Sequence, residues 1–230
     1  QDVTVRVIER GVAAIDPAGR PIQRVAYVEA NERAIVAAQT SDATLVLWWK
    51  DPSGTERREA VRVGSGGAVT ALDVGRTGTA IAGNDRGEIG IWALGDAAIE
   101  AGTGRVGDSP VSAIGYVIGH RTMIVGTADG QVAAWFLAPV GADETEVLVP
   151  LATFEPHRAA VTSIAASTRD RSFVTAAADG EVRVHHQTSR RTLLTLNGTQ
   201  PVRHVVMTPR SDGLVVAREG GAIDQFALSN

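Results

Sequence analysis

A fivefold internal repeat constrains this 230-residue chain more than any other feature. Each unit opens on a β-branched residue that follows Ala or Pro, and it closes on an aromatic residue or histidine. The opening residues are Ile22, Val69, Val111, Val161 and Val202. The closing residues, which we call the anchors, are Trp48, Trp92, Trp135, His185 and Phe226. Five positions before the anchor, the last four units carry Gly87, Gly130, Gly180 and Gly221, whereas the first carries Ala43.

The spacing and composition of the repeat predict an all-β fold. Short apolar, β-branched runs are bounded by Gly, Asp, Asn and Pro, and no stretch sustains a helical apolar period. A unit of roughly 40–45 residues is the size of one four-stranded propeller blade, whose faces are buried by stacking against neighbouring blades. We therefore expect a single β-propeller domain over residues 1–230. Its five blades are predicted at about 21–63, 68–106, 110–154, 160–196 and 201–228.

The last unit ends too soon to supply a fourth strand. An unassigned strand-like segment, Val3–Ile8, stands at the other end of the sequence. We expect this segment to complete the last blade and to close the ring. An open arc, finished by sequence outside this chain, is the alternative geometry. Because the sequence starts at Gln1 rather than Met, we expect it to belong to a longer polypeptide.

Composition excludes several classes of function. The 22 basic and 26 acidic residues give a net charge of −4, which does not fit a generally basic nucleic-acid binder. Cysteine is absent, so the chain has no disulfide, thiolate metal site or cysteine nucleophile. No nucleophile, base and orienting group can be assembled from the motifs. We therefore predict no catalytic residue, no cofactor and no metal site.

Three motifs invite a ligand-binding interpretation, and for each we favour a structural one. His185 and His186 are adjacent on an expected strand and point to opposite faces, so they do not chelate one ion. The recurring Asp85, Asp129 and Asp179 stand beside turn glycines, where a carboxylate caps its own backbone amides. The spacing of Gly102, Gly104 and Gly107 matches a dinucleotide fingerprint, but we expect these residues to lie in a loop without the following helix that the fingerprint requires.

The candidate partner surface consists of exposed-looking residues outside the repeat pattern. We expect the anchor tryptophans to be buried. Trp49 alternates to the other face of its strand and is therefore predicted to be exposed and available to a partner. Arg57, Arg58, Arg190 and Arg191 are suited to carboxylate or phosphate contacts, although arginines on outer strands also protect sheet edges.

The repeats resemble WD40 repeats. The matching features are His157 followed by Val161, the turns Thr127–Gly130 and Ala177–Gly180, and the terminal Trp92 and Trp135. No unit ends in the Trp-Asp pair of the family. The resemblance implies a buried hydrogen-bonded network of His, Ser or Thr, Asp and Trp. In the fourth unit His157, Thr175 and Asp170 are available for it, with His185 where the tryptophan would be.

The chain also resembles the soluble insert in long forms of the bacterial phosphate ABC transporter permease subunit. That resemblance implies a non-enzymatic interaction or regulatory domain on the periplasmic face of the inner membrane, within a longer membrane protein. Its partners would be other transporter subunits or a solute-binding protein, and not nucleic acid. A freestanding WD40-like interaction scaffold is the alternative. A propeller enzyme with an axial metal is a third reading, which the mostly apolar residues expected on the innermost strands disfavour: Val25, Ala71, Ile114 and Ile164.

Overall fold

The computed structural model of the protein describes residues 15–30, 33–140 and 145–228. These residues form nineteen β-strands in five antiparallel sheets, and they contain no helix. No helix long and apolar enough to span a membrane is therefore present in the part of the chain that the structure describes. The prediction of an all-β propeller with about five blades is confirmed, although the described residues of the fifth blade supply three strands rather than four.

Each blade is a meander of consecutive strands. The first blade comprises β1 (Ile22–Ala30), β2 (Arg33–Thr40), β3 (Leu45–Lys50) and β4 (Glu56–Val61). The second comprises β5 (Val69–Gly75), β6 (Thr79–Asn84), β7 (Glu88–Leu94) and β8 (Ala98–Arg105). The third comprises β9 (Val111–Tyr116), β10 (Thr122–Thr127), β11 (Val132–Val140) and β12 (Thr145–Phe154). The fourth comprises β13 (Val161–Ala166), β14 (Ser172–Ala177), β15 (Val182–His186) and β16 (Arg191–Leu196). The fifth comprises β17 (Val202–Met207), β18 (Gly213–Arg218) and β19 (Ile223–Ala227).

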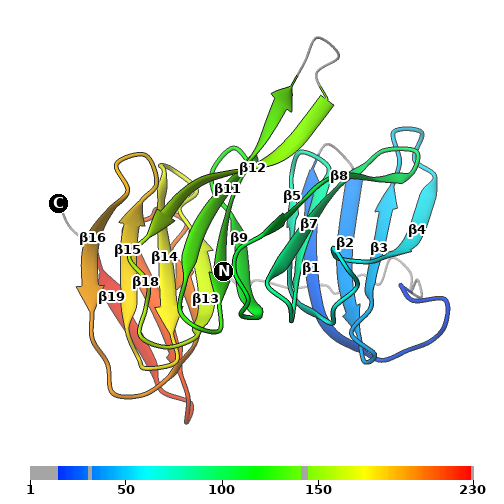
Figure 1. Cartoon of the computed structure of the whole chain (residues 1–230). Helices are drawn as coiled ribbons and strands as arrows, with labels where there is room; N and C mark the ends of the chain where they lie inside the picture. The colour runs from blue at the N-terminus through cyan, green and yellow to red at the C-terminus, as the bar shows by residue number, and fades with distance from the viewer. Residues whose placement is uncertain (1–14, 31–32, 141–144, 229–230) are drawn as a thin grey trace, which may run out of the picture.

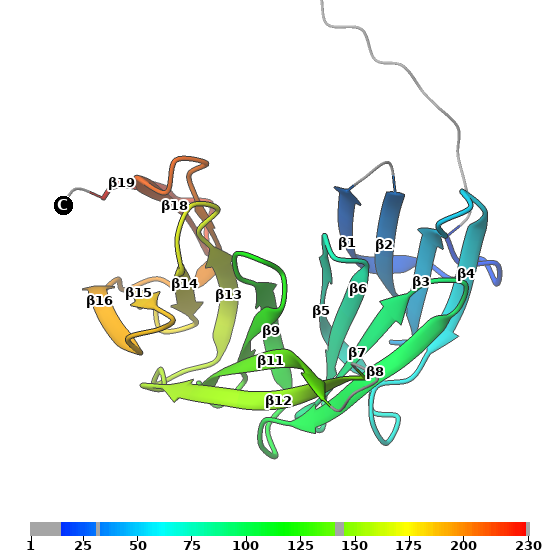
Figure 2. The same ribbon diagram turned by 90° about the horizontal axis from the view of Figure 1, so that it is seen from above.

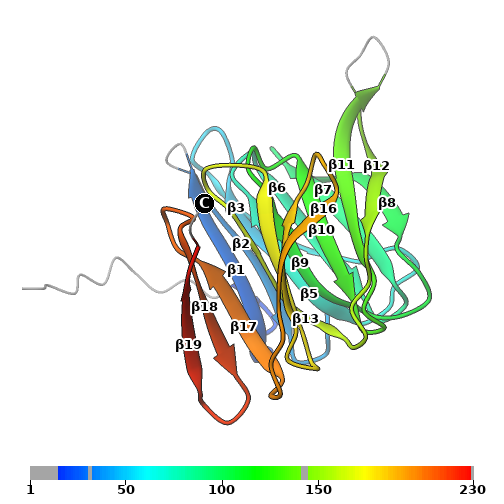
Figure 3. The same cartoon turned by 90° about the vertical axis from the view of Figure 1, so that its left-hand side faces the viewer.

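The blades stand side by side in an arc (Figures 1 and 2). Their first strands line the inner side, where β5 contacts β1 and β9, and β13 contacts β9 and β17. The first and fifth blades are not packed against each other as neighbouring blades are, and Figure 2 shows the arc open between them. In Figure 3, β19 forms the outer edge of the fifth sheet. The segment expected to complete this sheet and close the ring, Val3–Ile8, lies outside the described residues.

The turn before each anchor strand requires a left-handed residue. Gly87, Gly130 and Gly180 have φ of 74°, 91° and 92°, a region that glycine enters without a steric penalty. Ala43 adopts a φ of 60° at the same place in the first blade. A Cβ on Gly130 would lie 2.2 Å from the carbonyl oxygen of His157, so this glycine also permits a close backbone approach.

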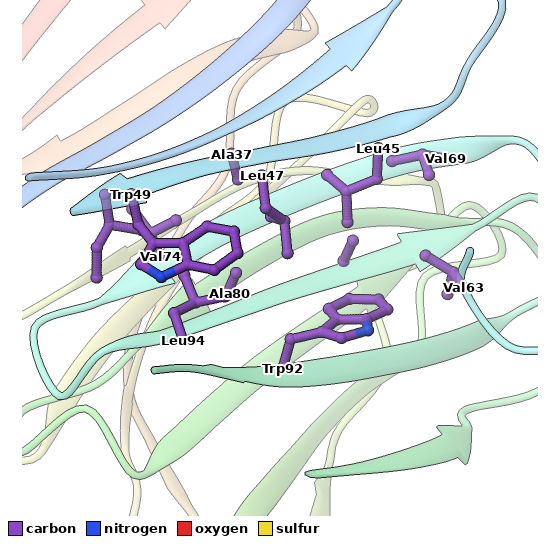
Figure 4. Packing of buried hydrophobic residues seen from close by; sticks show 12 residues of the cluster. Ala37, Leu45, Leu47, Trp49, Val63, Val69, Val74, Ala80, Trp92 and Leu94 are labelled. Carbon is purple, nitrogen blue, oxygen red and sulfur yellow. The ribbon is translucent and has the colours of Figure 1, made fainter. Parts of the chain in front are cut away.

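Apolar side chains fill the spaces between neighbouring blades, as expected for sheets that are too small to bury both faces alone. Figure 4 shows Leu47, Trp49 and Trp92 directed into the space between the first two sheets, where they form one buried cluster with Leu45 and Val69. Three further clusters fill the spaces between the second and third, third and fourth, and fourth and fifth blades. The hydrophobic core is therefore divided among the interblade interfaces.

Hydroxyl groups join the innermost strands across two of these interfaces. Thr70 Oγ1 donates to the carbonyl oxygen of Val111 at 2.6 Å, and Ser112 Oγ donates to that of Val161, also at 2.6 Å. Each hydroxyl follows the opening residue of its own blade and reaches the opening residue of the next. The sequence positions that carry the repeat thus also connect the blades.

One prediction about the glycine-rich stretch is wrong. Gly102 and Gly104 lie inside β8 and not in a loop. A Cβ on Gly104 would approach the Trp135 ring to 2.7 Å, and one on Gly102 would approach Leu148 to 2.9 Å. These glycines therefore let the third blade pack closely on β8, which explains their spacing without a nucleotide.

Candidate interaction surfaces

The anchors hold the same position in the strand pairing of their blades, and their side chains point in the same direction. Trp92, Trp135 and His185 pair across the sheet with Ala80, Met123 and Phe173, and each faces the preceding blade. These three anchors are buried. Phe226 faces the fourth blade in the same way and is partly buried. The face of a blade that carries its anchor is therefore covered by the blade before it.

On the first blade, no described blade covers the face that carries the anchor, Trp48. Trp48 pairs with Val36, and Val36 pairs with Tyr27, which places all three on one face of the sheet. Tyr27 is 59% exposed, whereas its equivalents Val74 and Tyr116 are 5% and 6% exposed. Trp48 is half-buried. The inner end of this face is an exposed apolar surface, because no described blade precedes the first.

The prediction that Trp49 is exposed is wrong. Trp49 is completely buried between the first and second blades, and its Nε1 donates to the carbonyl oxygen of Gly95 at 2.7 Å. Alternation along β3 does turn Trp49 away from Trp48, but the face it occupies is the one that the second blade covers. Trp49 is therefore a core residue and not a partner contact.

The four candidate arginines lie on the surface at separate places. Arg57 is paired with the buried carboxylate of Asp51 at 3.0 Å, and Arg58 lies 3.5 Å from Glu56. Arg190 and Arg191 are exposed at the start of β16 in the fourth blade. Figure 1 shows β4 and β16 at opposite ends of the arc. The structure does not bring the two arginine pairs into one site.

A hydrogen-bonded chain runs through the fourth blade. Its donors and acceptors are fixed by the carboxylate at one end: His157 Nδ1 donates to Glu181 Oε2 at 2.7 Å. His157 Nε2 therefore accepts from Thr175 Oγ1 at 2.7 Å, and Thr175 Oγ1 accepts from His185 Nε2 at 2.9 Å. This is the network that the WD40 resemblance implies, with two differences. His185 replaces the tryptophan, and Glu181 takes the place expected for Asp170.

Burial keeps both histidines of this hydrogen-bonded network, His157 and His185, neutral. Burial, with smaller contributions from His157 and Arg183, lowers the pKa of His185 to about 3. Burial and the nearby Arg183 lower the pKa of His157 as well, against the opposing effect of Glu181. His185 also lies 4.9 Å from the Phe173 ring centroid in a stacked arrangement. The pair is therefore an internal element of the blade and is not placed for proton transfer to a ligand.

The recurring aspartates occupy turns. Asp85 Oδ1 accepts from the Ala68 amide at 3.0 Å, Asp129 Oδ1 accepts from the Thr127 hydroxyl at 2.5 Å, and Asp179 Oδ1 accepts from the Glu181 amide at 3.1 Å. Within residues 15–30, 33–140 and 145–228, no three His, Cys, Asp or Glu side chains are arranged to hold a metal ion.

The innermost strands line an open axial cavity of about 340 Å³. Residues from all five blades line it, and most of its wall is apolar or hydroxyl-bearing. His204 on β17 is the one histidine in this lining, and its Nδ1 lies within hydrogen-bond distance of Ser163 Oγ, at 3.2 Å. The residues that line the cavity are Arg24, Val25, Ala71, Leu72, Ser112, Ala113, Ile114, Thr162, Ser163, Ile164 and His204.

A larger groove of about 930 Å³ lies between the fourth and fifth blades. The loops at its end are joined, because Ser167 Oγ and Ser211 Oγ lie 2.8 Å apart and Thr168 Oγ1 donates to Pro209 O at 3.1 Å. Leucines from β16 are exposed in it: Leu193 is 57% and Leu194 36% exposed. The residues that line it are Arg169, Asp170, Ser172, Val184, His186, Leu193, Leu194, Met207, Arg210, Ser211, Asp212, Ala227 and Leu228. We call this the β16–β19 groove.

Sequence reasoning did not identify the β16–β19 groove. A signal was available in the pair Leu193-Leu194, two adjacent large apolar residues near the end of the fourth predicted blade. One of two adjacent strand residues faces away from the sheet's covered side. The pair therefore indicates an apolar side chain on a face of β16 that its own sheet does not cover.

Comparisons with known proteins agree with the fold. The WD domain, G-beta repeat (WD40) family matches residues 148–186, from within β12 to the end of β15. The β-propeller domain of Cps50 (Swd1) from Myceliophteria thermophila superposes with a TM-score of 0.69 at 13% identity, over 85% of this chain and 67% of that chain. No curated protein matches the sequence.

Two computationally designed proteins are also similar in structure. Ika8 matches with a TM-score of 0.64 at 16% identity, over 91% of this chain and 71% of its own. Ika4 matches with a TM-score of 0.59 at 20% identity, over 74% of this chain and 96% of its own. The protein is thus a β-propeller, and residues 148–186, from the outer strand of the third blade to β15 of the fourth, match the WD40 repeat. Domains of the WD40 family generally mediate protein–protein interactions.

Proposed function

We propose that this chain is a non-enzymatic protein-interaction scaffold that binds its partner at the β16–β19 groove. The observation that carries the proposal is the exposure of Leu193 and Leu194 in a large groove whose end loops are joined by hydrogen bonds. Adjacent exposed apolar residues with a polar rim are typical of protein interaction sites. The axial cavity supports the proposal less, because it is smaller and its hydroxyls already have hydrogen-bond partners within the protein.

Site-specific photo-crosslinking in the native cell tests this proposal. A photoreactive amino acid replaces Leu193 in one variant and Ile99 in the other. Ile99 is a matched control, because it is an equally exposed apolar residue (66%) on another outer strand, β8. We expect a protein adduct of one defined mass at position 193 and none at position 99. No adduct at 193, or the same adducts at both positions, would reject the groove as the binding site.

For the parent protein, we propose a membrane-embedded permease subunit of a bacterial phosphate ABC transporter, with this domain on the periplasmic side. The sequence resemblance described above supports this context, and other transporter subunits or a solute-binding protein would then be the partners. An antibody to the domain tests it by cell fractionation. A band in the membrane fraction far above the 24.0 kDa of this chain, together with altered phosphate uptake after domain deletion, is expected. A soluble band near 24.0 kDa would favour the freestanding scaffold instead.

A further inference from the structure

The loop that joins the fourth blade to the fifth contains an asparagine followed by a glycine, Asn197 and Gly198. It begins directly after β16, beyond the last pair of the ladder, Val182 with Leu196. Asn197 is exposed and borders an open hollow of about 660 Å³ in the surface. Its side-chain amide is therefore accessible to water.

The main chain of this loop is held less firmly than that of the equivalent loop one blade earlier. After the third blade, His157 N donates to Gly130 O at 2.9 Å and fixes the loop to the turn before the anchor strand. In the fourth blade the corresponding oxygen, Gly180 O, accepts instead from the side chain of Arg218 at 3.3 Å. Residues 197–199 form no main-chain hydrogen bond with any other described residue.

An asparagine followed by glycine can react with its own main chain. The Gly198 nitrogen attacks Cγ of Asn197, the Cγ–Nδ2 bond breaks, and ammonia leaves with the proton of the attacking N–H. Water then opens the resulting succinimide ring at either carbonyl carbon, which gives aspartate or isoaspartate. Glycine favours the first step, because it has no Cβ to hinder the attack or to restrict the backbone.

We propose that Asn197 is a site of spontaneous deamidation in the folded protein. The reaction needs only water as co-reactant, and water reaches the exposed side chain. Neither the Asn197 side-chain amide nor the Gly198 N–H is held by a hydrogen bond to another described residue, so both reacting groups are free to approach each other. This inference does not depend on the proposed scaffold function.

Asn84 shows the opposite environment within the same fold. It is completely buried, and its Nδ2 donates to Val63 O at 3.2 Å and to Glu88 Oε2 at 2.7 Å. Its successor is Asp85, whose Cβ hinders the attack. Asn84 should therefore remain unchanged under conditions that convert Asn197.

Deamidation changes both the charge of the hollow and the length of the loop. Asp179, Glu181 and Arg158 line the hollow beside the asparagine, so a new carboxylate adds to a lining that is already acidic. In isoaspartate the main chain continues through the side-chain carboxyl carbon, which inserts one extra carbon atom before Gly198. Conversion therefore gives a more negatively charged protein, which anion-exchange chromatography separates from the parent.

Incubation of the folded full chain at pH 8 and physiological temperature tests the proposal. Mass spectrometry of proteolytic peptides measures conversion at Asn197, and enzymatic methylation of isoaspartate identifies the succinimide route. The same chain unfolded in urea gives the reference rate. We expect conversion at Asn197 in the folded protein within tenfold of that reference, with isoaspartate among the products, and no conversion at Asn84 over the same period.

The variant Asn197→Gln is the matched control. Its longer side chain keeps the amide but would have to close a six-membered ring, so the more negative species should form at least tenfold more slowly. The proposal is overturned if Asn197 in the folded protein stays unconverted, or if it converts more than tenfold more slowly than in the unfolded chain. Aspartate without isoaspartate would mean direct hydrolysis of the side chain and would also overturn it.

Discussion

His185 occupies the position that Trp92 and Trp135 hold in the neighbouring blades. Its Nε2 donates to Thr175 Oγ1 at 2.9 Å, where the WD40 resemblance implies an indole N–H. A histidine at this position also brings a titratable group into the core. Because burial lowers the pKa of His185 to about 3, the folded protein binds a proton there far less readily than the unfolded chain does.

A pH dependence of stability follows from this shift. Below pH about 6.5 the unfolded chain takes up a proton on His185 that the folded protein does not bind until pH about 3. The free energy of unfolding should therefore fall as pH decreases across this range. Near pH 5 His185 alone should contribute a slope of about 1.4 kcal/mol per pH unit. Denaturant titrations at pH 8, 6 and 5 measure it.

The variant His185→Trp isolates this contribution. It keeps a donor to Thr175 and removes the titration, so the slope near pH 5 should decrease by about 1.4 kcal/mol per pH unit. His157 and His120, whose pKa values burial also lowers, contribute to the remaining slope. At pH 8, where these imidazoles are neutral, the difference between the free energies of unfolding of the parent and the variant gives any change in packing. Subtracting that difference isolates the effect of titration. An unchanged slope would mean that His185 is solvated in solution.

Ala43 carries a local backbone strain that its counterparts avoid. Its φ of 60° is one that an L-residue adopts at a cost of about 1 kcal/mol, whereas Gly87, Gly130 and Gly180 adopt similar values freely. Ala43→Gly should stabilise the fold by about 0.5 kcal/mol, because the relief of strain exceeds the added entropy of the unfolded chain. Chemical denaturation measures this. Gly130→Ala is the opposite control and should destabilise, since its Cβ would meet His157 O at 2.2 Å.

The two adjacent tryptophans show how far local sequence reasoning reaches. Alternation along β3 correctly places Trp48 in the anchor register and Trp49 on the opposite face. It does not say which face another blade will cover. Trp49 is buried because the second blade packs on it, whereas Trp48 is half-buried because no described blade precedes the first. Glu181, rather than Asp170, contacts His157 for the same reason: the contact depends on how the loop after β12 meets the turn before β15.

At the scale of strands, hydroxyls on β5 and β9 connect one blade to the next. Ser112 Oγ lies 2.6 Å from Val161 O on the next blade and 3.3 Å from Gly126 O on its own. Ser112→Ala should destabilise the fold by about 1–2 kcal/mol, because a partly buried carbonyl loses its donor. Ser41→Ala, at an exposed hydroxyl, is the matched control and should change stability by less than about 0.5 kcal/mol. Thermal and chemical unfolding of both variants checks this.

The first three strands of each blade were predictable from the sequence, but the outer strands and what packs beside them were not. The Val-Thr-Ala, Val-Ser-Ala and Val-Thr-Ser openings and the glycine turns mark the first three strands of a blade, because those strands are buried and their turns need left-handed residues. Outer strands are exposed and vary freely, so β8 was placed only approximately and its glycines were assigned to a loop. The groove beside β16 lies between two blades, so no pattern within one strand describes it.

At the scale of the whole molecule, five blades form an arc and not a closed ring in the described residues. The strand pairing shows which residues would have to meet if the first and fifth blades packed together. Asp73 Oδ2 accepts from the Tyr116 amide at 3.0 Å across the second interface, and the equivalent positions at the two ends of the arc are Val206 and Tyr27. Both are exposed, at 43% and 59%. Among the described residues, an apolar side chain is therefore exposed at each end of the arc.

Disulfide trapping tests this open arrangement most directly, because the chain contains no native cysteine. The pair Tyr27→Cys/Val206→Cys should remain reduced under mild oxidation, since a disulfide requires Cα atoms within about 7 Å. The control pair Ser167→Cys/Ser211→Cys, whose hydroxyls lie 2.8 Å apart between the fourth and fifth blades, should oxidise readily. Mass spectrometry of the oxidised proteins shows whether each of the two disulfides has formed. A disulfide between positions 27 and 206 that forms as fast as the control would show that five blades close on themselves, and would contradict the open arc.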